Sequence, residues 1–171
     1  MQGASARKVV FDPRPILGVL VHHQVRFVVI GGVAASLQGS TTITNDFDIC
    51  YSRDSDNLER LAAALTEVGA TLRGAREPVA FRLDARTLKA GLNFTFDTKY
   101  GPFDCRGEAS GSFDYEQLTT NADEMDLVGT KVPVASLDDL IRMKRAAGRP
   151  KDRIELEVLA AVREERDAAA D

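Results

Sequence analysis

The sequence contains few of the residues on which much protein chemistry depends: among 171 residues there are two cysteines, two histidines and no tryptophan. Cys50 and Cys105 are too few for a disulfide framework, so we expect no disulfide partner. Even with His22 and His23 added, a Cys/His zinc site is difficult to assemble. A serine or cysteine nucleophile would have to use one of those two adjacent histidines, which disfavours covalent hydrolase chemistry. The side chains left for catalysis are mainly carboxylates.

Long apolar runs are lacking as well. No stretch approaches the ~18–20 apolar residues that cross a bilayer, and the start, MQGASARKVV, lacks the apolar core of a signal peptide. We therefore expect a cytoplasmic protein without a membrane partner. Aromatic residues make up only 6% of the chain, which disfavours a stacking platform for single-stranded nucleic acid.

The overall composition, 44% hydrophobic and 28% charged residues, is typical of a globular domain. The net charge is −4, but residues 142–153 contain six basic residues and one acid, so the rest of the chain carries −9. A basic edge on an acidic body attracts phosphate groups locally. The alternative is an ordinary solvated helix surface.

Hydrophobic periodicity and turn residues predict helices and strands without regular β-α alternation, which indicates the α+β or mixed-sheet α/β class. We expect one domain over 1–171, with a flexible tail at 1–10 and C-terminal helices at 136–168 packed on the rest. Helices are expected at 13–23, 33–37, 54–69, 84–89, 115–118, 136–147 and 151–167. Strands are expected at 26–30, 47–51, 79–83, 92–97, 103–106, 125–128 and 132–134, and 107–111 is expected to be a loop.

Gly31 and Gly32 join a predicted buried strand directly to a short helix. Such a junction presents free backbone N–H groups with no side chain in the way, which suits an anion such as phosphate. A Gly-Gly turn is also a common tight connection, so this feature alone is weak.

Asp46 and Asp48 are two residues apart in a predicted strand, so both carboxylates should point to one face while Phe47 and Ile49 face the core. Neighbouring carboxylates repel each other unless a cation lies between them. Oxygen ligands without His or Cys favour Mg²⁺ over zinc. The alternative is a pair of solvent-facing aspartates on an edge strand.

Asp104 belongs to a later strand and faces away from its neighbours Phe103 and Cys105. If that strand lies beside the strand at 47–51, three carboxylates converge, and one of them could take a proton from an attacking hydroxyl. Asp97 on the neighbouring strand is the rival for this third position. We rank it lower because it belongs to a polar strand face.

Together, VVIGGVAASLQGSTTITNDFDIC and GPFDCRG resemble the nucleotidyltransferase superfamily, which has the DNA polymerase β-like fold. The stretch VPVASLDDLIRMKRAAGRPKDRIELEVL is similar to the helical tail of small stand-alone bacterial members, including AbiEii-type toxin nucleotidyltransferases. The resemblance implies a short mixed sheet flanked by helices. It covers roughly residues 25–160.

The resemblance also implies roles for single residues. Gly31 and Gly32 would hold the triphosphate of an NTP, with Thr44 as a further phosphate contact. Asp46, Asp48 and Asp104 would bind two Mg²⁺ ions, with Mn²⁺ as an alternative, and would be the catalytic residues. Asp104 would also assist deprotonation of the acceptor hydroxyl.

Lys144 continues the inward-facing stripe of its helix, where a lysine either extends past the core to solvent or reaches an anion in a cleft. The resemblance favours a phosphate contact. Arg149 and Lys151 are weaker candidates for the same role or for an RNA acceptor, and Asp152 is expected to pair with one of them.

The resulting hypothesis is a metal-dependent nucleotidyltransferase that moves an NMP to an acceptor hydroxyl and releases pyrophosphate. The acceptor could be RNA such as a tRNA, a protein or a small molecule, and a toxin with a cognate antitoxin protein is one version. One alternative is an antibiotic nucleotidyltransferase. Another is a degenerate nucleotide- or partner-binding module, because Gly32 and Thr42 stand where relatives often carry Ser and Arg.

Overall fold

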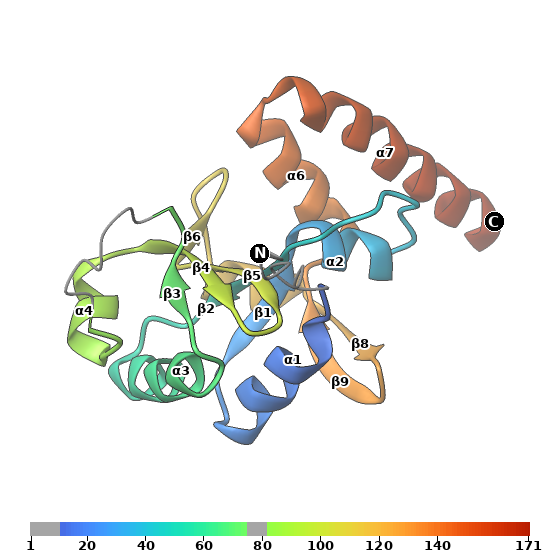
Figure 1. The fold of residues 1–171 in the computed structure, drawn as a ribbon. Helices are drawn as coiled ribbons and strands as arrows, with labels where there is room; N and C mark the ends of the chain where they lie inside the picture. The colour runs from blue at the N-terminus through green and yellow to red at the C-terminus, as the bar shows by residue number, and fades with distance from the viewer. Residues whose placement is uncertain (1–10, 75–81) are drawn as a thin grey trace, which may run out of the picture.

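Residues 11–74 and 82–171 are described by the computed structural model. Its main feature is a seven-stranded mixed sheet in the order β3-β4-β5-β2-β1-β9-β8 (Figure 1). The pairs β2–β5 and β1–β9 are parallel, and the other neighbours are antiparallel. The strands of this sheet are β1 Phe27–Ile30, β2 Phe47–Tyr51, β3 Thr71–Leu72, β4 Asn93–Thr98, β5 Gly101–Arg106, β8 Asp123–Leu127 and β9 Thr130–Val134.

The helices lie on both sides of this sheet. Figure 1 shows α1 and α3 together on one side and the pair α6 and α7 on the other, with α7 extending away from the strands. Their bounds are α1 Pro13–His22, α2 Gly31–Leu37, α3 Ser55–Glu67, α4 Ala85–Ala90, α5 Tyr115–Asn121, α6 Leu137–Ala147 and α7 Pro150–Ala170. This mixed α/β architecture is the predicted fold class.

The alternation of side chains along β2 separates the core from a polar face. Phe47 and Ile49 are fully buried, and the Phe47 ring stacks on that of Phe103 in β5 at a centroid distance of 5.6 Å. Burying a side chain of this size contributes about 1.5–3 kcal/mol. Asp48 lies between Phe47 and Ile49 in sequence and therefore points to the opposite face.

The two C-terminal helices form a pair whose geometry is set by its turn. The Ser136 hydroxyl caps α6 by accepting from the Asp139 N–H at 3.1 Å, and Gly148 ends the helix in the left-handed conformation at φ 61°. Pro150 then starts α7, which runs back past α6. Arg166 in α7 donates to the backbone oxygen of Gln38 at 2.6 Å, so α7 is attached to the end of α2.

Two local predictions were wrong. Helix α2 begins at Gly31 and not at Val33, because Ile30 is extended up to the helix start and the glycines form the first turn. The expected loop at 107–111 contains a strand, β6 Glu108–Ala109, which pairs with β7 Phe113–Asp114. These two-residue strands are too short to leave a periodic pattern in sequence. The predicted tail at 1–10 and most of the predicted strand at 79–83 lie outside the described residues.

Candidate active site

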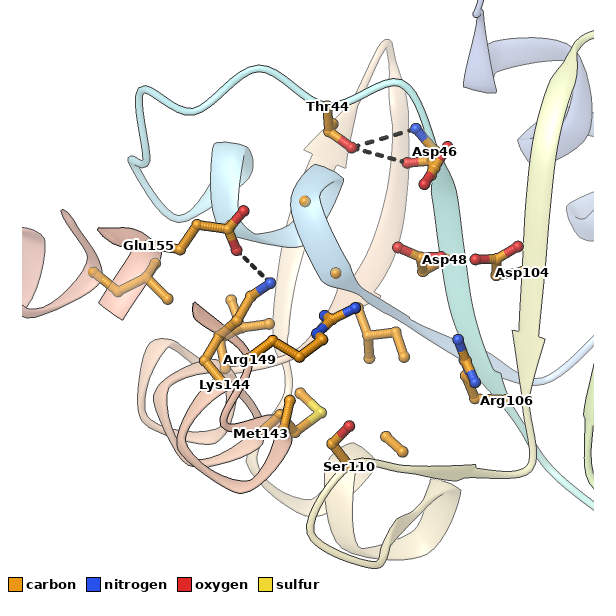
Figure 2. A pocket seen from close by; sticks show the side chains of 18 of the residues that line it. Thr44, Asp46, Asp48, Asp104, Arg106, Ser110, Met143, Lys144, Arg149 and Glu155 are labelled. Atoms are coloured by element: carbon orange, nitrogen blue, oxygen red, sulfur yellow. Dashed lines mark hydrogen bonds and ion pairs between the residues drawn. The ribbon is translucent and has the colours of Figure 1, made fainter. Parts of the chain in front are cut away.

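Strand register brings Asp48 and Asp104 together. The parallel pairing of β2 with β5 sets Asp48 directly beside Asp104, as expected from the sequence. Partner residues in neighbouring strands project to the same face of the sheet, so both carboxylates lie on the face opposite to Phe47. Figure 2 shows the two side chains next to each other at the wall of a pocket.

This pocket has a volume of about 690 Å³ and lies between the sheet and the helices α2, α6 and α7. All seven predicted site residues line it: Gly31, Gly32, Thr44, Asp46, Asp48, Asp104 and Lys144. It also contains groups that the sequence analysis left unassigned or gave a minor role, which are Asn93, Arg106, Ser110, Ser112, Arg149, Lys151 and Glu155.

The carboxyl of Asp48 is the most perturbed titratable group in the pocket. Burial raises its pKa to about 7, and the charge and hydrogen bond of Asp104 together with the charge of Asp46 act in the same direction. The Arg106 guanidinium partly opposes this rise. Either protonation or a bound cation would therefore stabilise the Asp48 carboxyl group in this position.

Asp104 has a cationic partner that sequence reasoning missed. The side chain of Asp104 is 10% exposed, and its Oδ1 accepts a hydrogen bond from Arg73 Nη2 at 3.0 Å. Arg73 follows β3 in a stretch without hydrophobic periodicity, so no sequence signal connects it to Asp104. The rival carboxylate, Asp97, is 55% exposed and pairs with the same arginine through Nε at 3.2 Å.

Asp46 lies just before β2 and not within it, so the prediction that both aspartates belong to the strand was wrong. Its position is set by Thr44, whose hydroxyl accepts from the Asp46 N–H and donates to the Asp46 carbonyl, both at 3.3 Å (Figure 2). Thr44 thus holds the backbone of a site residue. Its predicted contact with a phosphate stays a prediction.

The two glycines are required by close packing. Gly31 has φ +68°, which side chains rarely adopt, and a Cβ there would collide with the Asp48 carboxylate. A Cβ on Gly32 would lie 2.5 Å from both Cβ and Oγ1 of Thr44. The start of α2 therefore packs directly against Asp48 and Thr44, at a distance that only glycine allows.

The opposite wall of the pocket is built from ion pairs between α6 and α7. Lys144 Nζ contacts the Glu155 carboxylate (Figure 2). The same nitrogen lies 3.4 Å from Asp152 Oδ1. Asp152 is 1% exposed and accepts from the backbone N–H and Nε of Arg149 at 3.0 and 2.9 Å. The predicted pairing of Asp152 with a basic neighbour is confirmed, and Glu155 is the partner of Lys144 that the sequence analysis missed.

Asp48 and Asp104 suit a hard divalent cation in donor type. Both offer carboxylate oxygens, and burial together with the neighbouring carboxylates Asp104 and Asp46 raises the pKa of Asp48. Among the described residues, however, no group of three or more His, Cys, Asp and Glu side chains is arranged to hold a metal ion. Asp48 and Asp104 form a pair of adjacent carboxylates, and Asp46 is not placed to bind the same metal ion together with them.

The cysteines do not take part in this site. Cys50 and Cys105 are free and fully buried. Burial raises the pKa of the Cys50 thiol to about 12 and that of Cys105 well above its usual value, so neither is a thiolate nucleophile near neutral pH.

The helices of residues 11–74 and 82–171 include no membrane span. None of them combines the length and the apolar composition that crossing a bilayer requires.

Solved structures with the same fold were identified. Lincosamide antibiotic adenylyltransferase LnuA, bound to lincomycin, aligns with 87% of this chain and 94% of its own at a TM-score of 0.58 and 14% identity. ANT(2'')-Ia in complex with adenylyl-2''-tobramycin aligns over 90% and 95% of the two chains, at 0.54 and 18%. A proposed nucleotidyltransferase from Thermotoga maritima aligns over 90% and 96%, at 0.55 and 17%.

No curated protein matches the sequence. The family model for aminoglycoside-2''-adenylyltransferase matches residues 14–159, which is most of the chain. This match supports the predicted nucleotidyltransferase superfamily, whereas nothing in the comparisons supports the finer AbiEii-type likeness. The chain belongs to the aminoglycoside-2''-adenylyltransferase family and is a nucleotidyltransferase.

Proposed function

We propose that the protein transfers the nucleotidyl group of an NTP, with ATP as the first candidate, to a hydroxyl of an antibiotic-like small molecule. The family name and the two antibiotic adenylyltransferases among the structural neighbours support this acceptor class. They favour the antibiotic nucleotidyltransferase alternative over the toxin version of the main hypothesis.

The observation that carries the proposal is the side-by-side placement of Asp48 and Asp104 at the wall of a pocket that also contains Gly31. Two adjacent buried carboxylates are costly to maintain unless a cation or a reacting proton uses them. A pocket of this volume has room for a small ligand.

Each residue then has a role in the transfer. An oxygen of the acceptor hydroxyl forms a bond to the α-phosphorus, the bond from that phosphorus to pyrophosphate breaks, and the hydroxyl proton passes to Asp104. The Gly31 and Gly32 backbone, the Thr44 hydroxyl and Lys144 contact the phosphates of the NTP.

Asp46, Asp48 and Asp104 would hold Mg²⁺ or Mn²⁺, which supplies charge stabilisation for the entering and leaving oxygens when bound. The three carboxylates are not arranged to bind one metal ion together. Asp46 therefore has to move toward Asp48 and Asp104 before all three can bind the same ions. Its position just before β2 leaves it outside the ladder that holds Asp48, so this approach need not break a strand pairing.

RNA acceptors and an antitoxin partner remain predictions that the comparisons do not support. A binding module without transfer also remains an alternative outcome. The three candidate functions predict different products after incubation with an NTP. An antibiotic nucleotidyltransferase labels a small molecule, an RNA-modifying enzyme labels RNA, and a binding module leaves the NTP intact.

The test is incubation of the purified protein with each α-labelled NTP and Mg²⁺, together with lincomycin, tobramycin or total cellular RNA. We expect pyrophosphate release and label on a small molecule. Label on RNA would replace the acceptor class, and nucleotide binding by calorimetry without pyrophosphate release under any condition would favour the binding module.

Asp104→Asn and Asp139→Asn form a matched pair for this assay. Both remove a buried, ion-paired carboxylate, but Asp139 pairs with Arg142 on α6 at 2.9 Å and does not line the pocket. We expect Asp104→Asn to lose transfer and Asp139→Asn to keep it in the fraction that folds. Equal activity of the two variants would remove Asp104 from the reaction.

A further inference from the structure

We propose that Arg73 is a positioning residue for Asp104: it fixes the orientation of the carboxylate that receives the acceptor proton. This inference rests on the proposed function. The geometry behind it does not, because it follows from strand register and from contacts that are present without any ligand.

Register places Arg73 in line with the carboxylate pair. Leu72 in β3 is paired with Phe96 in β4, and the backbone N–H of Arg73 donates to the Thr95 carbonyl at 3.0 Å, which continues the ladder by one residue. Thr95 is paired with Asp104, and Asp104 with Asp48. Arg73 therefore begins a row that crosses four strands and reaches Asp48 on the same face of the sheet.

The guanidinium of Arg73 is held by several acceptors at once. Nη2 donates to the Phe96 carbonyl at 2.8 Å and to Asp104 Oδ1 at 3.0 Å, while Nε donates to Asp97 at 3.2 Å. One of these acceptors is a backbone oxygen within β4, so the guanidinium cannot follow Asp104 if that side chain rotates. A planar fork with fixed donor directions is suited to this task.

The consequence for Asp104 is a restricted carboxylate. Rotation about its Cβ–Cγ bond would break the contact of Oδ1 with Arg73, in a side chain that is only 10% exposed. Oδ1 of Asp104 thus accepts from Arg73, and Oδ2 is left to face Asp48 and the pocket. A misplacement of about 1 Å at a reacting group can cost on the order of 100-fold in rate.

Arg26 provides a matched control. It also pairs with two aspartates, Asp54 at 3.2 Å and Asp56 at 3.0 Å, and its side chain is 36% exposed against 33% for Arg73. Arg26→Gln and Arg73→Gln therefore each remove a similarly exposed arginine with two carboxylate partners, one away from the pocket and one beside it. Both partners of Arg26 are exposed, whereas Asp104 beside Arg73 is buried. Thermal melts of both variants identify the folded fraction.

The first measurement is steady-state kinetics with the acceptor that the wild type uses. We expect Arg73→Gln to lower kcat by roughly 10- to 100-fold, with KM for the nucleotide within about twofold, and Arg26→Gln to match the wild type. An arginine that only attaches β3 to the sheet would lower the melting temperature and leave kcat of the folded fraction unchanged, which overturns the proposal.

The second measurement does not need an acceptor: titration of Mn²⁺ into the protein with ATP, followed by electron paramagnetic resonance. If Arg73 orients Asp104, Arg73→Gln weakens Mn²⁺ binding several-fold, although it removes a positive charge. If Arg73 only neutralises Asp104, its removal tightens Mn²⁺ binding. Tighter or unchanged binding overturns the proposal.

Arg73→Lys separates geometry from charge. A lysine keeps the positive charge, but its single ammonium group cannot reproduce the fork, so we expect it to behave like Arg73→Gln. Full rescue by lysine would overturn the proposal. If the wild type transfers nucleotide to no acceptor, the proposed function fails, whereas the Mn²⁺ titration still decides the role of Arg73.

Discussion

The two walls of the pocket are built in different ways. On the sheet wall, Asp48 and Asp104 are brought together by the backbone ladder of β2 and β5, and the start of α2 packs on Asp48 through Gly31. On the helical wall, Lys144 and Arg149 are held by side-chain ion pairs to Asp152 and Glu155. One wall is fixed by main-chain hydrogen bonds and the other by ion pairs between side chains.

This difference teaches which groups are preorganised for chemistry and which can change partners. A strand ladder fixes Cα positions whether or not a ligand is bound, so the backbone positions of Asp48 and Asp104 are the same before and after binding. The ion pairs of Lys144 and Arg149 satisfy their charges in the absence of an anion. Lys144 can exchange Glu155, whose side chain is 29% exposed, for a phosphate, whereas loss of the Arg149 contact would leave the buried Asp152 carboxylate short of a partner. Substitutions in the sheet wall should therefore have larger effects than substitutions in the helical wall.

The largest effect is expected for Asp48→Asn. It should reduce nucleotide transfer by about 10³-fold, as the loss of a group that stabilises charge in the transition state does. The melting temperature should not fall, because the substitution also removes the repulsion between adjacent carboxylates. Pyrophosphate release and a thermal melt on the same preparation test both parts. Retained transfer in the folded variant would remove Asp48 from the mechanism.

Gly31→Ala is expected to have the next largest effect. The added Cβ collides with the Asp48 carboxylate, and the residue has φ +68°, so both the position of Asp48 and the backbone are strained. We expect a loss of transfer of roughly 100-fold, measured at saturating nucleotide. Gly18→Ala is the control: nothing lies within 4 Å of its Cβ and the residue is inside α1, so stability should rise slightly.

The sheet wall is also the part that could be predicted from sequence. The alternation around Phe47 and Phe103 predicts the face of Asp48 and Asp104, and β2 covers the expected strand at 47–51 but not Asp46. The alternation at 92–97 predicts β4, whereas β5 begins at Gly101, two residues before the predicted strand at 103–106. Local periodicity is enough here because side-chain direction in a strand depends only on the period of two.

The remaining parts of the site could not be predicted because they depend on contacts between distant segments. Arg73 reaches Asp104 across β4, and Glu155 meets Lys144 only because α7 turns back on α6. Neither contact leaves a pattern in the sequence. Asp46 was wrongly placed in the strand because its spacing from Asp48 fits the alternation, although the ladder stops at Phe47.

The pH dependence of stability gives a smaller test of the sheet wall. The pKa of Asp48 is about 7 in the folded protein and about 3.9 when unfolded. Between these values the folded state keeps a proton that the unfolded state has lost, so stability falls as pH rises from about 4 to 7 and is then level.

We expect a loss on the order of 2 kcal/mol between pH 5 and 8 in chelator, measured by urea unfolding. Asp48→Asn should flatten this dependence, and saturating Mg²⁺ should reduce it in the wild type. A wild-type profile that stays flat in chelator would contradict the raised pKa of Asp48, which burial and, after it, the neighbouring Asp104 cause.

The smallest effect is expected on the helical wall, for Glu155→Gln. Lys144 pairs with two carboxylates, Glu155 and Asp152. Loss of the Glu155 charge should tighten ATP binding by about two- to fivefold, because it frees Lys144 from one of its two partners. Asp138→Asn is the control because it breaks an α6–α7 ion pair that lies outside the pocket, the one with Arg163 at 3.2 Å. Calorimetry with ATP decides the sign. Weaker binding in Glu155→Gln would mean that this carboxylate holds Lys144 in its nucleotide-binding position, and the helical wall would then be as preorganised as the sheet.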